Sequence, residues 1–257
     1  MINQHLFFNT SIGVKKPNSI RDKQQACPFC AREQLTGILA LDGPIILLKN
    51  KFPVLENTFQ TVLIETDDCN AEFSTYSLPH LHRLLKFGLK AWLEMENSGD
   101  YTSVLFFKNH GPLSGGTIAH PHMQIIGLKD LDYKENSKEE FFRGILLKEQ
   151  NKVRFSLSTE PRIGFYEFNV QMSDDEYVKE FGEYVQIAAH YIMHHFPFKA
   201  TSYNLFFHHL NGEIFAKIVP RFVTTPIYIG YGIPQVPNNL QWMVEQIKDI
   251  YFTRNSK

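Results

Sequence analysis

The sequence predicts an α+β protein built from two related halves, residues 1–145 and 146–257. Segments typical of strands occur in runs with one helix inserted, whereas a doubly wound parallel sheet would need strict alternation of strands and helices. A strand–strand–helix–strand–loop–strand order in the first half is followed by a similar order in the second half. Because no clear sequence repeat accompanies this order, the order of elements alone supports the two-half organisation.

The first half contains short apolar and β-branched runs and one long amphipathic segment. Apolar residues recur at helical spacing over 79–96, where Pro79 suits the first turn of a helix. A Gly-rich loop is expected at 109–119, between the last two strands. Strands are predicted at 43–49, 61–65, 103–108 and 123–128.

The second half repeats this pattern after a stretch rich in Lys and Glu. That stretch, 129–151, is predicted to be a solvated helix or connector. Helices are expected at 174–195, which has an acidic first turn, and at 240–251. Strands are predicted at 153–157, 164–170, 203–209 and 214–219.

Composition excludes several classes of protein. A 43% hydrophobic and 14% aromatic content excludes a disordered chain. The formal net charge of −1 disfavours binding to nucleic acid by bulk charge. Three cysteines, an odd number, argue against a secreted disulfide framework. Since neither a signal peptide at 1–16 nor a membrane-spanning run is recognised, a cytoplasmic protein without a membrane partner is expected.

The segment 107–126, FKNHGPLSGGTIAHPHMQII, carries the strongest chemical signal. In a strand, His120, His122 and Gln124 would share one face. The glycines of the preceding loop allow close approach of the backbone to a ligand, and successive N–H groups can hold phosphate oxygens. An imidazole beside such a loop fits a nucleophile or a general acid/base for phosphoryl chemistry, although a single strand histidine is more often structural.

Cys27 and Cys30 form a C-x-x-C pair with three interpretations. A thioredoxin-like redox pair would need a preceding apolar strand, which the polar residues before Cys27 do not provide. Two unrelated thiols are a second interpretation. The third is a structural zinc site in which Cys69 and His120 complete a Cys3His set. In that case the metal would anchor the strand that presents His122.

These motifs resemble the galactose-1-phosphate uridylyltransferase branch of the histidine-triad superfamily. The family pattern FxNxG…G…HPHxQ is present without gaps as Phe107, Asn109, Gly111, Gly115, His120, Pro121, His122 and Gln124. The C-x-x-C pair and the turn at 65–69 stand where the family places zinc ligands. The segment 50–53 resembles the family's Asn-x-Phe element near the nucleotide, and weaker similarities follow at 218–221 and 229–231. The resemblance implies two histidine-triad-like halves, each an antiparallel sheet with packed helices, the second half being degenerate.

The resemblance further implies nucleotidyl transfer through a covalent nucleotidyl-histidine on His122, with a UDP-like or ADP-like nucleotide or nucleotide sugar as partner. Gln124 replaces the last histidine of triad hydrolases and is expected to hydrogen-bond the phosphoryl oxygens. A structural zinc and a homodimer are compatible with the family. The residues expected to bind substrate are Asn50, Phe52, Asn109, Gly115, Gly116, Thr117 and Tyr231.

The sequence also departs from the family. Cys69 stands where the family usually has a histidine, and Glu213 and Phe215 replace ligands of a second metal site, which we expect to be lost. Gly232 replaces a glutamate that reads the hexose hydroxyls. Two alternatives therefore remain, a triad-like hydrolase of nucleotide conjugates and a non-catalytic nucleotide-binding protein. The remaining histidines are expected to be structural or surface residues: His80, His82, His190, His194, His195, His208 and His209.

Overall fold

The computed structural model describes residues 5–20, 22, 24 and 26–253. Residues 1–4, part of the segment searched for a signal peptide, lie outside this range. The chain forms two compact units, residues 1–136 and 137–257, which are considered separately below. Among the described residues, no helix combines the length and the apolar character that crossing a membrane requires.

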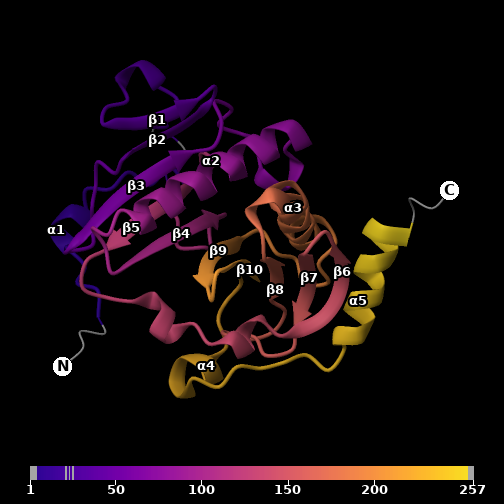
Figure 1. The fold of residues 1–257 in the computed structure, drawn as a ribbon. Coiled ribbons are helices and arrows are strands. Elements are labelled where there is room, and N and C mark those ends of the chain that lie inside the picture. The colour runs from indigo at the N-terminus through magenta and orange to yellow at the C-terminus, as the bar shows by residue number, and fades with distance from the viewer. Residues whose placement is uncertain (1–4, 21, 23, 25, 254–257) are drawn as a thin grey trace. The chain divides into compact units, whose positions relative to one another are not determined.

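The first unit is an antiparallel sheet with one long helix on one face (Figure 1). Its strands follow the order β1-β2-β3-β5-β4, and each pairs antiparallel with its neighbours. The elements are α1 (Thr10–Gly13), β1 (Ile38–Asp42), β2 (Ile45–Lys49), β3 (Thr58–Ile64), α2 (Leu78–Asn97), β4 (Ser103–His110) and β5 (His122–Leu128), with 3-10 turns at Arg32–Gln34, Phe73–Thr75 and Tyr133–Asn136.

Helix α2 packs on the sheet through its apolar stripe. Trp92 is fully buried, contacts the ring of Phe106, and donates its indole N–H to the carbonyl of Val104 at 2.9 Å. Gly88 lets the helix approach closely, because a Cβ there would lie 2.9 Å from Cζ of Phe106. The opposite face of the sheet carries a smaller apolar cluster, formed by Phe29, Ile46, Leu48, Val62 and Ile64. The helix therefore leaves that second face available for a site.

The second unit has the same connectivity. Its antiparallel sheet follows the order β9-β10-β8-β7-β6, which corresponds to β4-β5-β3-β2-β1 of the first unit. The elements are β6 (Gly144–Gln150), β7 (Val153–Ser158), β8 (Phe168–Met172), α3 (Val178–His194), β9 (Tyr203–Leu210), β10 (Glu213–Pro220), α4 (Pro226–Tyr231) and α5 (Leu240–Lys248), with 3-10 turns at Glu139–Phe142 and Asp175–Tyr177 and a π-helical turn at Asp249–Thr253.

Helix α3 covers one face of this second sheet. Tyr191 of α3 contacts Phe168, and Phe181 contacts Phe207. Strands β9 and β10 are joined by Asn211 and Gly212, whose φ values of 52° and 79° fit a tight hairpin turn. The corresponding strands of the first unit are joined by the long Gly-rich loop, so the two units differ most at this connection.

The predicted fold class is confirmed, and four details differ. The edge strand β1 was not predicted, because all five of its residues are exposed and show no alternation. The expectation of a helix or connector over 129–151 was wrong for its last part, where β6 forms a charged edge strand. The strand expected at 164–170 lies at Phe168–Met172. Short helix α4 was also missed.

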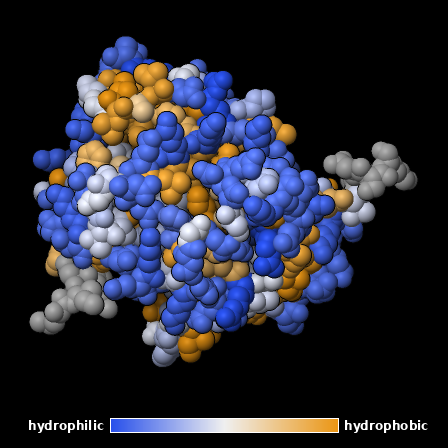
Figure 2. Space-filling model, viewed as in Figure 1, coloured by the Kyte–Doolittle hydropathy of each residue, from blue (hydrophilic) through white to orange (hydrophobic). Residues whose placement is uncertain are grey.

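Apolar side chains remain exposed over two elements. Figure 2 shows hydrophobic colour over β1 and, separately, over α4. The exposed apolar residues of β1 are Ile38, Leu39 and Leu41, and those of α4 are Ile227, Ile229 and Tyr231.

Candidate active site and metal centre

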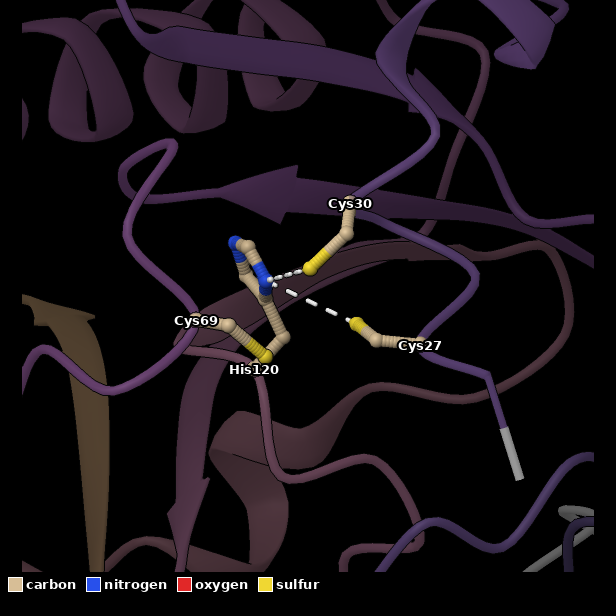
Figure 3. A group of neighbouring side chains, drawn as sticks. All are labelled: Cys27, Cys30, Cys69 and His120. Atoms are coloured by element: carbon tan, nitrogen blue, oxygen red, sulfur yellow. Dashed lines mark hydrogen bonds between the residues drawn. The ribbon is translucent and has the colours of Figure 1, made fainter. Parts of the chain in front are cut away.

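Three thiols and one imidazole converge in the first unit (Figure 3). The ligand atoms of Cys27, Cys30, Cys69 and His120 all lie within 4.8 Å of one another. Nδ1 of His120 is 3.6 Å from Sγ of Cys27 and 3.7 Å from Sγ of Cys30. Tetrahedral zinc with ordinary bond lengths would place an imidazole nitrogen about 3.6 Å from each thiolate sulfur. These distances are compatible with a zinc site.

The orientation of the His120 ring is fixed by a hydrogen bond on the side away from the thiols. Its Nε2–H donates to the carbonyl of Thr66 at 2.8 Å, so Nδ1 carries the lone pair that faces the thiols. Burial lowers the pKa of His120, which favours the neutral ring that binds metals. Burial, together with hydrogen bonds to the other two thiols, raises the pKa of Cys69 to about 12. The three sulfur atoms could all be thiolates only if a cation balanced their charge. A metal ion would provide that charge, so this donor set suits a metal ion.

His122 begins β5 two residues after His120. Its Nδ1–H donates to the carbonyl of His120 at 2.8 Å, which leaves the lone pair on Nε2. Burial lowers the pKa of His122 to about 4, so the ring is neutral near pH 7. Phe29, between the two cysteines in sequence, contacts both imidazoles edge-on, with ring centroids 5.8 Å from His120 and 5.5 Å from His122. The ring of Phe29 and the carbonyl of His120 thus connect the thiol cluster to His122.

A pocket of about 330 Å³ lies on the helix-free face of the first sheet. Its lining includes every substrate-binding and catalytic residue expected from the sequence except Tyr231. These residues are Asn50, Phe52, Asn109, Gly115, Gly116, Thr117, His122 and Gln124. Apolar walls come from the cluster that contains Phe29, Leu48 and Val62. A small molecule with one planar and one charged part would suit such a lining.

The Gly-rich loop is folded by local hydrogen bonds. Gly115 has φ +88°, a conformation that side chains rarely adopt. The hydroxyl of Ser114 donates to the carbonyl of Gly111 at 2.7 Å and accepts from the N–H of Gly116 at 3.3 Å. At the other side of the pocket, the side-chain oxygen of Asn50 accepts from the N–H of Phe52 at 2.9 Å. Local hydrogen bonds therefore shape both loops.

Sequence reasoning missed the charge of this pocket. Lys16, Lys49 and Lys51 line it, whereas no acidic residue is among its described lining residues. The ammonium of Lys49 lies over the ring of Phe59, 5.9 Å from the ring centroid, on the side of the sheet that α2 covers. Burial lowers the pKa of Lys16. Lysines are common on surfaces, so the sequence gives no signal that Lys16 and Lys51 face one pocket. They make the pocket locally cationic in a chain whose net charge is −1.

The second unit holds the remaining candidates. Tyr231 lies on α4, is 80% exposed, and is not among the residues that line the pocket. His208 is buried against the ring of Phe142 and lies 3.2 Å from the hydroxyl of Ser137. Glu213 accepts a hydrogen bond from Gln171 at 2.8 Å. Within the described residues, no second group of His, Cys and acidic side chains converges as the first does.

Comparisons with solved structures define the fold class. An ADP-glucose phosphorylase from Arabidopsis thaliana, solved with bound ADP-glucose, matches with a TM-score of 0.71 and 16% identity, covering 90% of this chain and 94% of the other. A uridylyltransferase matches with a TM-score of 0.69 and 16% identity, covering 88% and 91%. The chain thus has the fold of these uridylyltransferase-like structures, as the sequence predicted.

The family is set by closer matches. Two models of the DUF4931 family, described as a domain of unknown function, match residues 8–131 (N-terminal domain) and 134–252 (C-terminal domain). A DUF4931 family protein from Bacillus cereus matches with 44% identity and a TM-score of 0.77, covering 84% of this chain and all of the other. The chain belongs to the DUF4931 family. No curated protein matches its sequence at a significant level.

Proposed function

We propose that the protein is a nucleotidyltransferase that works through a covalent nucleotidyl-histidine on His122. The observation that carries the proposal is the hydrogen bond from Nδ1–H of His122 to the carbonyl of His120. This bond leaves Nε2 unprotonated on a residue that lines a cationic pocket. A neutral, oriented imidazole is a competent nucleophile for phosphorus.

The reaction has two displacements. In the first, Nε2 of His122 attacks the α-phosphorus of a nucleotide donor, forming a P–N bond and breaking the P–O bond to the leaving phosphate. In the second, a phosphate oxygen of the acceptor attacks the same phosphorus, and the P–N bond breaks. Gln124 carries an amide, which neither gives nor takes a proton, so it suits hydrogen bonding to phosphoryl oxygens. Because the leaving group and the acceptor are both phosphates, the transfer needs no general acid or base in addition to His122 and Gln124.

The other pocket residues have binding roles in this proposal. Gly115 brings its backbone N–H group to the phosphates, Gly116 allows a close approach because it has no side chain, and the hydroxyl of Thr117 adds a donor. Lys16 and Lys51 balance the phosphate charge. The base and ribose would lie against Asn50, Phe52 and Asn109. Tyr231 remains a predicted ligand contact of the second unit.

We also propose that Cys27, Cys30, Cys69 and His120 hold one structural zinc ion. A structural zinc with four protein ligands supplies folding energy and no open coordination position. The chain's own residues then position the nucleophile: His120 and Pro121 connect the metal ligands to His122, and the carbonyl of Pro121 accepts from the N–H of Glu65 at 3.1 Å. The start of β5 is thereby held by the proposed metal bond at His120 and by the hydrogen bond at Pro121.

The donor is proposed to be a UDP-linked or ADP-linked sugar or a dinucleoside polyphosphate. The fold matches support this range, since the matched structures include a uridylyltransferase, an ADP-glucose phosphorylase and a yeast Ap4A phosphorylase. Gly232, at the position where the family has a hexose-reading glutamate, argues against galactose specificity.

The test is direct detection of the intermediate. The purified protein is incubated with UDP-glucose, ADP-glucose or diadenosine tetraphosphate without acceptor, denatured at alkaline pH to preserve the P–N bond, and measured by intact and peptide mass spectrometry. We expect a uridylyl or adenylyl adduct on the peptide containing His122, removed by adding a phosphate acceptor. His122→Asn is the variant, and Asn238→Leu, an exposed change in the second unit, is the matched control.

Each other outcome decides against a part of the proposal. The same adduct in His122→Asn would refute the nucleophile. Steady turnover in buffer without phosphate acceptor would identify a hydrolase. Nucleotide binding with neither adduct nor turnover across all donors would identify a non-catalytic binding protein. Zinc is tested separately by elemental analysis, with about one zinc per chain expected.

A further inference from the structure

The second unit contains a separate pocket of about 370 Å³. It lies on the face of the sheet opposite α3, because Asn169 and Gln171 alternate along β8 with Phe168, which packs on α3. The corresponding face of the first unit carries the pocket of His122. No metal-type cluster of described residues and no Gly-rich loop accompanies this second pocket, so the function proposed above makes no use of it.

Asn169 is the key residue. It is 2% exposed, and its side-chain oxygen accepts a hydrogen bond from Nζ of Lys217 at 2.8 Å. Lys217 is equally buried and also pairs with Glu167 at 2.8 Å. Because a cation faces the amide oxygen, the NH2 group must point the other way. No described residue accepts a hydrogen bond from this buried NH2 group, although Asn169 lines the pocket.

The carboxylate of Glu167 is itself held firmly. It accepts the backbone N–H groups of Arg162 at 2.9 Å and Ile163 at 2.8 Å. These hydrogen bonds connect the loop through Glu167 and Lys217 to Asn169, and a flip of the amide would turn its NH2 group towards the Lys217 ammonium, which is unfavourable. A buried donor that is held in place and lacks an acceptor indicates a ligand position.

The rest of the lining offers both acceptors and donors with balanced charge. Glu213 provides a carboxylate, and Ser156 provides a hydroxyl opposite Asn169 in the strand pairing. Two arginines, Arg143 and Arg154, also line the pocket, but each is near a glutamate, at 3.6 Å and 3.5 Å. Their charge is therefore already balanced, which disfavours a phosphate or another free anion.

The aromatic part of the pocket is small. Phe142 and Phe215 contact each other with ring centroids 4.6 Å apart, and Nζ of Lys217 lies 5.5 Å from the centroid of Phe142. The two rings give the pocket an apolar wall. A sugar has an apolar C–H face and hydroxyls that both donate and accept, which matches this lining.

We propose that this pocket binds a neutral monosaccharide, with the NH2 group of Asn169 donating to a sugar oxygen and Glu213 accepting from a hydroxyl. The proposal is independent of the nucleotidyltransferase function, since it uses other residues in another unit. No group is transferred, and no chemistry is assigned to the site.

The experiment is saturation-transfer NMR on the full chain with glucose, galactose and ribose, and with inorganic phosphate as the anionic probe. We expect transfer to at least one sugar and none to phosphate, with affinity at least ~10-fold weaker in Asn169→Leu. Asn238→Leu, the same change at an exposed position, should leave sugar binding unchanged. Gln171→Ala, at a half-buried position beside Glu213, gives a second variant should Asn169→Leu fold poorly.

Three results would overturn the proposal. One is the absence of transfer to all three sugars in the folded protein. Another is sugar binding that neither Asn169→Leu nor Gln171→Ala weakens, which would place the sugar elsewhere. The third is phosphate binding that Asn169→Leu abolishes, which would make the pocket an anion site.

Discussion

The ion pair between Lys108 and Glu65 allows the most quantitative prediction. Lys108 lies on β4 and Glu65 directly after β3, on the sheet face that α2 covers, and the two side chains are 1% and 0% exposed. Glu65 also accepts a hydrogen bond from the hydroxyl of Tyr76 at 3.0 Å. Replacing Lys108 by Met removes the cation and leaves a buried carboxylate with one neutral donor. Breaking a buried pair in this way costs about 3–5 kcal/mol.

The assay is urea unfolding followed by tryptophan fluorescence. The chain has two tryptophans, and Trp92 is buried in the first unit whereas Trp242 is half exposed in the second. In a Trp242→Phe background the signal therefore reports the first unit alone. Lys108→Met should lower the free energy of unfolding by about 3–5 kcal/mol, and adding Glu65→Gln should recover part of it because no charge then remains buried.

The control is Lys90→Met. Lys90 pairs with Glu94 one helical turn away at 3.7 Å, but both side chains are about 70% exposed. Pairs of this kind contribute about 0.3–0.5 kcal/mol, so the control should be nearly neutral. If Lys108→Met cost no more than Lys90→Met, the reasoning from burial would be refuted.

Three further predictions use urea unfolding, followed by Trp92 for changes in the first unit and by Trp242 for His208 in the second. Gly88→Ala should destabilise the first unit by about 1–3 kcal/mol, because its new Cβ would lie 2.9 Å from Phe106; an unchanged midpoint would contradict the close packing of α2. Burial lowers the pKa of His208 to about 3, so the unfolded chain binds this proton more readily. Stability from His208 is therefore complete above about pH 6.5 and is lost as pH falls towards 3, by up to ~1.4 kcal/mol per pH unit. His208→Phe should flatten the profile between about pH 6.5 and 5, and an unchanged slope would assign the effect to other groups. Removing the proposed zinc with a strong chelator should lower the midpoint of the first unit; Cys69→Ser should reduce zinc content, whereas Cys69→His should retain it, since histidine is also a zinc ligand.

Much of the candidate site could be predicted from the sequence because its residues are chemically distinctive and locally spaced. The alternation His120, His122, Gln124 fixes a common strand face, and only Cys and His at suitable positions can complete a C-x-x-C pair. The amphipathic stripe of α2 was equally clear. These signals depend on residue type and short spacing, which a sequence displays directly.

Other features depend on tertiary context and were missed. Lys16 and Lys51 face the pocket only because the N-terminal segment and the loop after β2 border it, and nothing local distinguishes them from surface lysines. Strand β6 lies at a sheet edge, so its charged residues resemble a connector. The direction of the Asn169 NH2 group is set by Lys217, which is far away in sequence and donates a hydrogen bond to the amide oxygen. Contacts between residues far apart in the chain produce no periodic pattern in the sequence.

The two units share one strand order but not one connection between their last two strands. In the first unit, residues 111–121 separate β4 from β5, whereas Asn211 and Gly212 alone separate β9 from β10. The second unit can thus be compared with the first as the same strand order without the long loop. The shared scaffold provides the strand order and the covering helix of both units, whereas among the described residues the long insert and the thiol cluster occur only in the first. Transplanting that insert into the second hairpin would measure how much of the chemistry is portable.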